Sequence, residues 1–526
     1  MQDKRSALPD PTPGFPLRVG VLDMGSNAIR FVVADFIAPS TWTALVSERL
    51  PVRLADRTTG TGLLSEEGIE AAVSVMERFR DVLVEHGVRN HRAVATSAVR
   101  ESENRRTLVK RVRERTGLRL EVISGAEEAR LVHRAARTRV PLGSEPWLMI
   151  DLGGGSLELA IVDDGGIRSL ESFAIGTVRL LAEFGGESSA QGRIRRLLDE
   201  FVSSLRFDSL GERPEVVGYI ASGGNIDDLA RVADANEDET GVSLLGLGDL
   251  RKAIETLAGM TIEERIEKFG LGENRADVIV PAAVIYARLA ERFDVSRIHV
   301  PHVGVKEGAM IDLVDDATGG EEGGARRARE VVAGAVALGR RFHFEEPHAL
   351  QVARLSERLF DALAEHYDLD RRDRDILTAA AILHDIGQRI AYKRHHKHAY
   401  YLISQSELPG LDLEDVELVA NVARYHRRAD PSRKHPPFEA LSDDDRERVT
   451  RLSAILRVAD ALDREHVQSV RGLRSELENE HMEIELQGEG DFELERWALD
   501  RKKGLFEKTF GLEIGVANDV VKNESA

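Results

Sequence analysis

Two short segments with the same order of residue types constrain the fold of this chain more than any other feature. Residues 23–27 read DMGSN and residues 151–158 read DLGGGSLE, and each segment follows a short apolar run. A strand that ends in Asp-x-Gly turns sharply, and its backbone N–H groups can then face an anion. The aspartate offers the hard oxygen ligand that Mg²⁺ prefers. Two such turns predict a duplicated fold that holds a phosphate between its halves.

A plain hairpin is the competing explanation for either turn alone, because Gly and Asn favour hairpin turns in any protein. Two turns of like sequence, each at the head of its own series of predicted strands, favour the phosphate site instead. A third glycine turn, at 222–224 (SGG), follows the buried strand predicted over Val216–Ala221.

Length and composition limit the remaining choices. A chain of 526 residues is too long for one hydrophobic core, so three or four domains are expected. The absence of cysteine excludes disulfides and thiolate metal sites. Residues 1–16 lack the apolar part of a secretory signal, and no apolar run approaches the ~20 residues of a membrane span. With a net charge of −19, which argues against general nucleic-acid binding, these features predict a cytoplasmic protein without nucleic-acid or membrane partners.

Strand and helix patterns alternate up to residue 312, as an α/β fold requires. Residues 315–324 (DDATGGEEGG) have the composition of a linker, and apolar residues then recur at helical spacing. Strands are predicted again near the end, over 481–486, 492–494 and 512–516. The expected organisation is a flexible N-terminus (1–16), α/β lobe I (17–140), α/β lobe II (141–314), a linker (315–324), an all-α domain (325–465) and a small α+β domain (466–526).

A hydroxyl pair, Thr96-Ser97, stands between a predicted strand and the start of a helix. Such a helix start offers unpaired N–H groups to an anion, and Arg100 would add a bidentate phosphate contact. Alternatively, the hydroxyls only cap the helix and Arg100 is a surface residue.

Three acidic residues are candidates for catalysis. Glu127 and Glu128 open a predicted helix, where the helix dipole alone explains two carboxylates. The functional alternative makes one of them a general base aimed at a water molecule. Glu158 lies in an otherwise apolar strand, where an acid is unusual.

Seven segments carry a family resemblance: DMGSN, ATSAVRESEN, SGAEEAR, DLGGGSLE, FAIGTVRL, SGGN and GVKEG. In this order they resemble the exopolyphosphatase / guanosine pentaphosphate phosphohydrolase family of the acetate kinase–Hsp70–actin superfamily. The resemblance implies two ribonuclease-H-like (actin-like ATPase) lobes with a cleft between them, and release of terminal phosphate with Mg²⁺. It implies Glu128 as the catalytic base, Glu158 as the group that positions water or metal, and Asp151 as a metal-associated acid. The implied phosphate-binding residues are Asp23, Gly25, Ser26, Asn27, Arg100, Gly153, Gly154, Gly155, Ser156, Ser222, Gly223 and Gly224.

The helical region carries a second resemblance. A His, then His-Asp, then further His residues and a late Asp follow the ligand order of the HD superfamily of metal phosphohydrolases. The resemblance implies a second metal site suited to Zn, Mn or Fe, in which paired ions can activate water. Its residues are His348, His384, Asp385, His398, His426 and Asp460.

Alternatively, the helical domain has lost its metal and only binds long substrate. Basic residues beside the histidines would then line a track for a polyanion. Alternatively, they only form the solvated end of a helix. These residues are Lys393, Arg394, Lys397, Arg427 and Arg428.

The sequence therefore predicts an exopolyphosphatase in which water, deprotonated by Glu128, attacks the terminal phosphate in line with the bond that breaks. A guanosine pentaphosphate (pppGpp) 5′-phosphohydrolase is the alternative within the same chemistry, and no residue decides between the two. From other classes, a non-catalytic polyphosphate or alarmone sensor and a second hydrolase in the HD-like domain remain open. Expected ligands are Mg²⁺, polyphosphate or pppGpp, and a transition metal in the HD-like domain. A homodimer is also expected.

Overall fold

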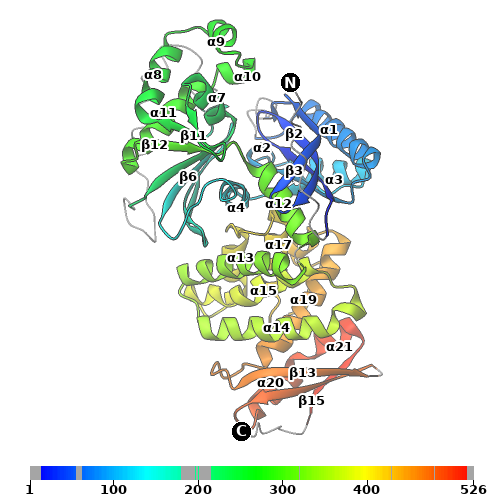
Figure 1. The fold of residues 1–526 in the computed structure, drawn as a ribbon. Helices are drawn as coiled ribbons and strands as arrows, with labels where there is room; N and C mark the ends of the chain where they lie inside the picture. Colours follow the sequence, from blue (N-terminus) through cyan, green and yellow to red (C-terminus); the bar gives the residue numbers. More distant parts are fainter. Residues whose placement is uncertain are drawn as a thin grey trace. The chain divides into compact units, whose positions relative to one another are not determined.

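The computed structural model describes residues 14–54, 62–173, 175–178, 180, 196, 200, 215–318, 320–427, 429–478 and 480–517. By its internal contacts the chain divides into two compact units, Met1–Gly324 and Ala325–Ala526 (Figure 1). Among the described residues, none of the helices combines the length and apolar character that crossing a membrane requires.

Lobe I of the first unit is a five-stranded sheet in the order β3-β2-β1-β4-β5. The first three strands are antiparallel, and β4 and β5 add to them in parallel. This 3-2-1-4-5 order is the ribonuclease-H-like arrangement that the resemblance implied. The elements are β1 (Leu17–Met24), β2 (Ile29–Ala38), β3 (Thr41–Leu50), α1 (Glu66–Glu85), β4 (Asn90–Ala95), α2 (Ser97–Arg100), α3 (Arg105–Thr116) and β5 (Glu121–Val122).

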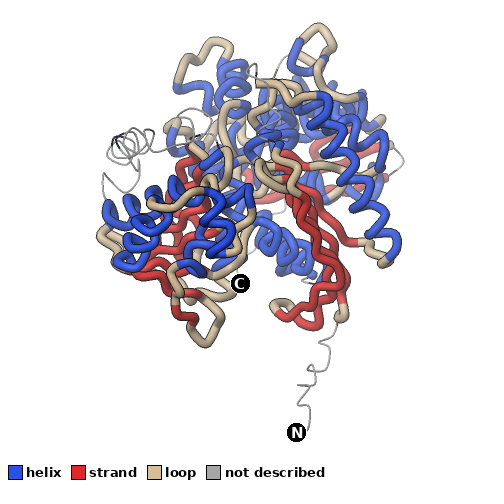
Figure 2. The backbone as a smooth tube through the Cα atoms, turned by 90° about the horizontal axis from the view of Figure 1, so that it is seen from above, coloured by secondary structure: helices blue, strands red, loops and turns tan. Residues whose placement is uncertain are grey.

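Lobe II repeats the same order in a seven-stranded sheet, β10-β11-β12-β9-β6-β7-β8, so that β8, β7, β6, β9 and β12 correspond to the five strands of lobe I. In Figure 2 the strands of the two lobes are red and the helices beside them blue. The elements are β6 (Trp147–Leu152), β7 (Leu157–Asp163), β8 (Gly166–Phe173), β9 (Gly218–Ser222), α7 (Gly224–Val232), β10 (Asn236–Glu237), β11 (Ser243–Gly246), α8 (Leu247–Ala258), α9 (Ile262–Phe269), α10 (Glu273–Ala276), α11 (Ile279–Phe293) and β12 (Arg297–Val300).

Two helices connect the lobes, because each packs on the sheet of the other lobe. Helix α4 (Gly125–Ala136) follows the last strand of lobe I but packs on β7 and β8 of lobe II, whereas α12 (Val305–Thr318) follows the last strand of lobe II but packs on β1 and β4 of lobe I. The helices cross where Gly308 meets α4, since a Cβ at Gly308 would lie 2.0 Å from the carbonyl oxygen of Leu131. Glycine is required here because the two backbones touch.

The predicted linker at 315–324 is mostly helical, and the boundary between the two compact units falls at its end. Helix α12 continues to Thr318, and α13 (Gly320–Arg341) begins two residues later. The last turn of α12 is held by Asp315, whose carboxylate pairs with the guanidinium of Arg134 on α4. Glycine is about 1 kcal/mol less favourable than alanine in a helix interior, so the glycines of this stretch predicted a linker and not a helix. The domain boundaries assigned from the sequence stay predictions.

The second unit begins with helices and ends with a small sheet on the same hydrophobic core. Helices α15 and α17 each start with a capping box, in which two aspartates satisfy each other's backbone N–H groups. The helices are α14 (Glu346–Tyr367), α15 (Arg371–Leu383), the 3₁₀ helix η2 (Ile386–Arg389), α16 (His395–Ser404), α17 (Leu413–Arg424), α18 (Pro436–Glu439) and α19 (Asp443–Ala461).

The tail is α+β, but the strand predicted over 492–494 is wrong. Phe492 has a φ of 54° and precedes α20, which starts at Glu493. Its ring is buried in the core, so the short apolar run reflects a helix start that packs inward. The tail elements are β13 (Val470–Glu478), β14 (His481–Gly488), α20 (Glu493–Lys502), α21 (Gly504–Phe510) and β15 (Glu513–Val516), and the strand β13 was not predicted.

Candidate active site

A cavity of about 310 Å³ lies in the first unit, and both predicted phosphate turns line it. The turn after β1 contributes residues 25–27, the turn after β6 contributes Gly153 and Gly154, and the turn after β9 contributes residues 222–224. Because corresponding strands of two duplicated sheets carry these turns, their ends converge from opposite sides.

The two Asp-x-Gly turns are in contact. The hydroxyl oxygens of Ser26 and Ser97 are 2.9 Å apart, and a Cβ at Gly155 would lie 2.8 Å from the Ser97 oxygen. A Cβ at Gly154 would lie 3.3 Å from the Ser26 Cβ. The small residues predicted from the motif are therefore needed for the close approach of the lobes.

A further glycine supports the second turn. A Cβ at Gly176 would lie 2.1 Å from the carbonyl oxygen of Gly154, and the N–H of Thr177 donates to the carbonyl of Gly153 at 3.1 Å. Thr177 also lines the cavity. Gly176 and Thr177 both belong to the segment FAIGTVRL, but the sequence alone predicts no role for either residue.

Three carboxylates gather at the cavity, two of them in its wall. Ligand oxygens of Glu128, Asp151 and Glu158 lie within 4.8 Å of one another. Asp151 ends β6 directly opposite Glu158 in the antiparallel register with β7, and Glu128 lies in the first turn of α4, whose N-cap is Ser124. Asp151 and Glu128 line the cavity itself, whereas Glu158, Gly155, Ser156 and Arg100 are not among its lining residues.

The electrostatics of this cluster favour a cation. Burial, together with the neighbouring charges of Glu128 and Asp23, raises the pKa of Asp151 to about 8. Burial and the charge of Glu128 also raise the pKa of Glu158 well above its usual value, despite the opposing charge of Arg100. Burial raises the pKa of Asp23 as well, although Arg30 opposes this.

The donor set fits Mg²⁺. Glu158 is 2% exposed, and its Oε2 has no hydrogen-bond partner among the described residues. An unpartnered buried carboxylate oxygen is costly, and a divalent ion with oxygen preference would satisfy it. Asp151 and Glu158 are therefore suited to hold the ion beside the phosphate turns.

Arg100 lies among the acids. Its guanidinium donates to Glu128 Oε2 at 3.0 Å and to Glu158 Oε1 at 3.4 Å. It also donates to the carbonyl of Ile123, which orients the fork. The role of Arg100 as a phosphate ligand stays a prediction.

Several charged residues of the cavity had no assigned role in the sequence analysis. Arg30, Arg275 and Lys306 bring positive charge to its wall, and Asp227 and Glu307 bring negative charge. Arg30 follows the DMGSN turn on β2, and Lys306 belongs to the GVKEG segment, so both lay within or next to recognised motifs. Only the fold brings Arg275 to the same wall.

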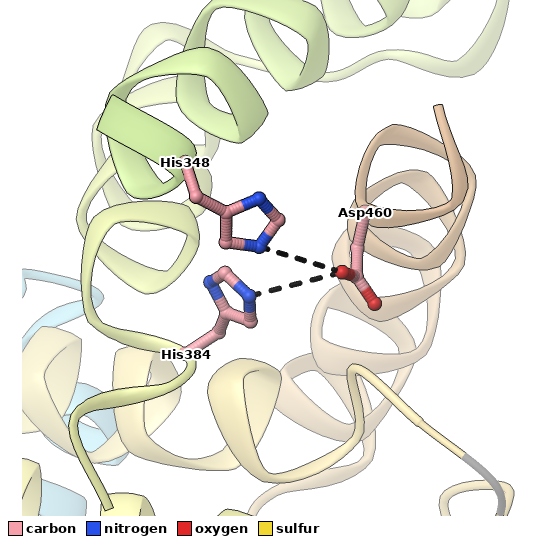
Figure 3. Close-up of side chains that lie close together, drawn as sticks. All are labelled: His348, His384 and Asp460. Carbon is pink, nitrogen blue, oxygen red and sulfur yellow. Dashed lines mark ion pairs between the residues drawn. The ribbon is translucent and has the colours of Figure 1, made fainter. Parts of the chain in front are cut away.

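The helical unit holds a second cluster (Figure 3). His348 from α14, His384 at the end of α15 and Asp460 from α19 point toward one another, with distances of 3.8 and 3.9 Å from the histidine Nε2 atoms to Asp460 Oδ1. Both Nε2 atoms are buried without a hydrogen-bond partner among the described residues. Their Nδ1 atoms are bonded, to Asp463 at 2.8 Å and to the carbonyl of Ala381 at 2.7 Å.

A neighbouring group contains Asp385, His395 and His426, whose ligand atoms also lie within 4.8 Å of one another. His395 occupies the place expected for His398, which lies further along α16 and outside both groups. Glycine in the HDIG segment explains the difference, because a Cβ at Gly387 would lie 2.1 Å from the carbonyl oxygen of His395. The 3₁₀ helix η2 therefore packs on the first turn of α16 and brings His395, not His398, to Asp385.

These two groups have the chemistry of metal ligands. Burial lowers the pKa of His426 to about 3, so its imidazole is neutral at pH 7 as coordination requires. Nδ1 of His395 and of His426 is bonded to a backbone carbonyl, which leaves Nε2 toward the centre. Of the predicted polyanion track, Lys393, Arg394 and Lys397 are exposed, Arg427 lies 3.3 Å from His395 Nε2, and Arg428 lies outside the described residues.

Two ribonuclease-H-like lobes around a cavity of glycine turns and carboxylates define a two-lobed α/β phosphate-handling protein. Residues 32–317 match the model of the Ppx/GppA phosphatase family, and residues 331–503 match the model of Ppx/GppA phosphatase domain III. The chain belongs to the Ppx/GppA phosphatase family.

Two named relatives illustrate the family. The chain is 28% identical over 312 residues to exopolyphosphatase 1 of Mycobacterium tuberculosis, which covers 58% of this chain and 90% of the relative. It is 26% identical over 423 residues to guanosine-5′-triphosphate,3′-diphosphate pyrophosphatase of Pseudoalteromonas translucida, which covers 77% of this chain and 80% of the relative.

Two solved structures are also similar. An exopolyphosphatase of Cytophaga hutchinsonii matches with a TM-score of 0.51 and 29% identity over 57% of this chain and 98% of that chain. A Ppx/GppA family member of Aquifex aeolicus matches with a TM-score of 0.51 and 25% identity over 57% and 99%. The predicted fold class, two such lobes followed by a helical domain, is confirmed.

Proposed function

We propose that this chain is an exopolyphosphatase, which hydrolyses the terminal phosphoric anhydride bond of inorganic polyphosphate. The observation that carries the proposal is the cluster of Glu128, Asp151 and Glu158 at a cavity that two predicted phosphate turns line. Among relatives, the names exopolyphosphatase and triphosphate-diphosphate pyrophosphatase both describe attack on phosphoric anhydrides.

In the proposed mechanism the terminal phosphate lies between the turns at 25–27 and 153–156, where backbone N–H groups neutralise its charge. Mg²⁺ held by Asp151 and Glu158 would supply further neutralisation. Glu128 accepts a proton from water, the water oxygen bonds to the terminal phosphorus, and the bridging P–O bond breaks. The products are inorganic phosphate and a polyphosphate shorter by one unit. Arg100 orients Glu128 through its hydrogen bond to Oε2.

The substrate is tested by phosphate release from long-chain polyphosphate and from pppGpp at equal enzyme concentration. Faster release from polyphosphate supports the proposal, and release from pppGpp alone makes the chain a pppGpp 5′-phosphohydrolase. Glu128→Gln tests the role of the base: loss of about 10²–10⁴-fold in kcat with retained substrate binding is expected. If the wild-type chain binds but turns over neither substrate, it is a regulator instead.

A second candidate function is favoured by one observation in the helical unit. The buried Nε2 atoms of His348 and His384 have no hydrogen-bond partner among the described residues, and both face Asp460. We propose that this group and the group of Asp385, His395 and His426 hold transition-metal ions, which would activate water for a second phosphohydrolase. The exposed basic residues Lys393, Arg394 and Lys397, at the start of α16, would guide a polyanion toward either histidine group.

Elemental analysis of the purified full chain tests the second site. Bound Zn, Mn or Fe that is lost in His384→Ala and kept in Glu128→Gln supports it. A metal-free chain, or metal that survives His384→Ala and His426→Ala, overturns it. The exposed His366 provides a matched control, because His366→Ala is expected to keep the metal. A homodimer and a cytoplasmic location stay predictions from the sequence.

A further inference from the structure

A buried group of charged side chains lies behind the candidate base, where α4 and α12 cross. Arg130 donates to both carboxylate oxygens of Glu127, at 2.6 and 2.9 Å, and also contacts Asp312 on α12. Arg134 reaches the other oxygen of Asp312 at 2.9 Å. Arg92 on β4 donates to Glu127 at 3.0 Å and completes the group.

This group is fully inside the protein, which is unusual for so many charges. Glu127 is 0% exposed, and the other members are 7% exposed or less. Although burial opposes ionisation, the guanidinium groups of Arg130 and Arg134 hold the pKa of Asp312 below its usual value, so its charge is retained. Buried ion pairs are weak sources of stability compared with apolar packing, so their value here is the fixed geometry that they impose.

The geometry that they fix is that of the cavity. Glu127 and Glu128 are consecutive in a helix and point about 100° apart, so that anchoring Glu127 inward sets the direction of Glu128 toward the cavity. Arg92 lies on β4, which is followed directly by Thr96 and Ser97, and Asp312 lies on the helix that also carries Lys306. Each element joined by the charged group thus contributes cavity residues or directly precedes them.

We infer that Glu127 and Asp312 are positioning residues, which hold the general base Glu128 in register with the phosphate turns across the crossing of α4 and α12. This inference rests on the proposed role of Glu128. Neither residue is among those that line the cavity, and the carboxylates of both are occupied by arginines. The backbones of α12 and α4 touch at Gly308 and Leu131. The loss of a charge at this crossing is therefore expected to displace α4.

A double-mutant cycle on the full chain tests the inference. Asp312→Asn keeps the shape but removes the charge, and it is expected to lower kcat by about tenfold or more with KM changed less than threefold, since small displacements of a catalytic group are costly. In a Glu128→Gln background, Asp312→Asn is expected to lower kcat almost no further, because this variant has no general base whose position could change.

Equal loss of kcat in both backgrounds overturns the inference and leaves the function of Glu128 standing. A fully active Glu128→Gln variant overturns both. Glu127→Gln, which changes the group from the α4 side, answers the same question if Asp312→Asn fails to fold. The control is Asp415→Asn, since Asp415 is a buried acid paired with Arg372 in the helical unit. It is expected to lose thermal stability and keep kcat.

Discussion

Glu158 is a buried acid whose presence the candidate site explains. It lies in a strand whose other residues, apart from Asp163 at the end, are buried and apolar, and its Oε2 has no hydrogen-bond partner among the described residues. Burial of an unsatisfied carboxylate oxygen costs on the order of 1–3 kcal/mol, so an unneeded acid here would be a liability. The sequence identified the residue as unusual, and the structure places it beside two other carboxylates.

The exchange Glu158→Gln is expected to weaken the apparent affinity for Mg²⁺ by about tenfold or more, because an amide oxygen is a poorer ligand than a carboxylate. The measurement is phosphate release as a function of Mg²⁺ concentration. The control is Glu114→Gln, at an exposed position on α3. An unchanged Mg²⁺ dependence in Glu158→Gln would show that Glu158 is not a ligand.

A buried histidine on α4 predicts a pH dependence of stability. Burial lowers the pKa of His133 to about 4, although its hydrogen bond to the carbonyl of Asp163 opposes this. The usual pKa is 6.5, so between pH 6.5 and 4 this histidine binds a proton in the unfolded chain but stays neutral in the folded chain. Its contribution to stability is therefore complete above pH 6.5 and is lost as the pH falls from 6.5 to 4.

The variant His133→Gln is expected to remove this loss. The difference in unfolding free energy between wild type and variant should change by at most about 1.4 kcal/mol per pH unit between pH 6.5 and 4. Denaturant titrations at pH 7.5, 6 and 5 measure it. The exposed His91 is the control, and His91→Gln should show a flat difference. A flat difference for His133→Gln would contradict the prediction.

At the scale of elements, the exchange of α4 and α12 between the lobes decides how the cavity is assembled. Local signals predicted both helices, since Ser124 caps α4 and the GVKEG segment opens α12. That each packs on the other lobe's sheet depends on contacts between residues far apart in the chain. The ion pair between Arg134 on α4 and Asp315 on α12 is another contact of this kind.

Two glycine variants separate this packing from helix propensity. Gly308→Ala is expected to destabilise the protein by about 1–3 kcal/mol, because its Cβ would overlap the backbone of Leu131. Gly248→Ala on α8 has open space around its Cβ and is expected to stabilise by about 1 kcal/mol through helix propensity. Chemical denaturation measures both. Stabilisation by Gly308→Ala would show that the helices do not cross closely.

At the scale of the whole molecule, the two candidate sites lie in different compact units. The carboxylate cluster and its phosphate turns belong to the first unit, and the histidine groups belong to the second. Residues 32–317 and 331–503 match models of the same family, so the family relation extends to both units. Two compact units need not unfold together, and one melting temperature does not describe them.

Removal of transition metal by a chelator is therefore expected to affect only the second unit. The Nε2 atoms of His348 and His384 would lose their metal ion, so amide exchange should rise in α14, α15 and α19 while β1 and β6 stay protected. Hydrogen-exchange mass spectrometry of the full chain measures this, and His384→Ala should show the same pattern without chelator. Equal exchange with and without chelator would contradict the prediction.

The sequence by itself determined the two Asp-Gly turns, most of the order of strands and helices, and most of the acids and histidines of both candidate centres, because these depend on local residue types and spacing. Only the tertiary structure decided that His395 takes the place expected for His398, that Phe492 starts a helix, and that Arg275 reaches the cavity. These outcomes depend on close contacts between distant segments, such as Gly387 against α16. Local patterns specify an element but not the neighbour on which it packs.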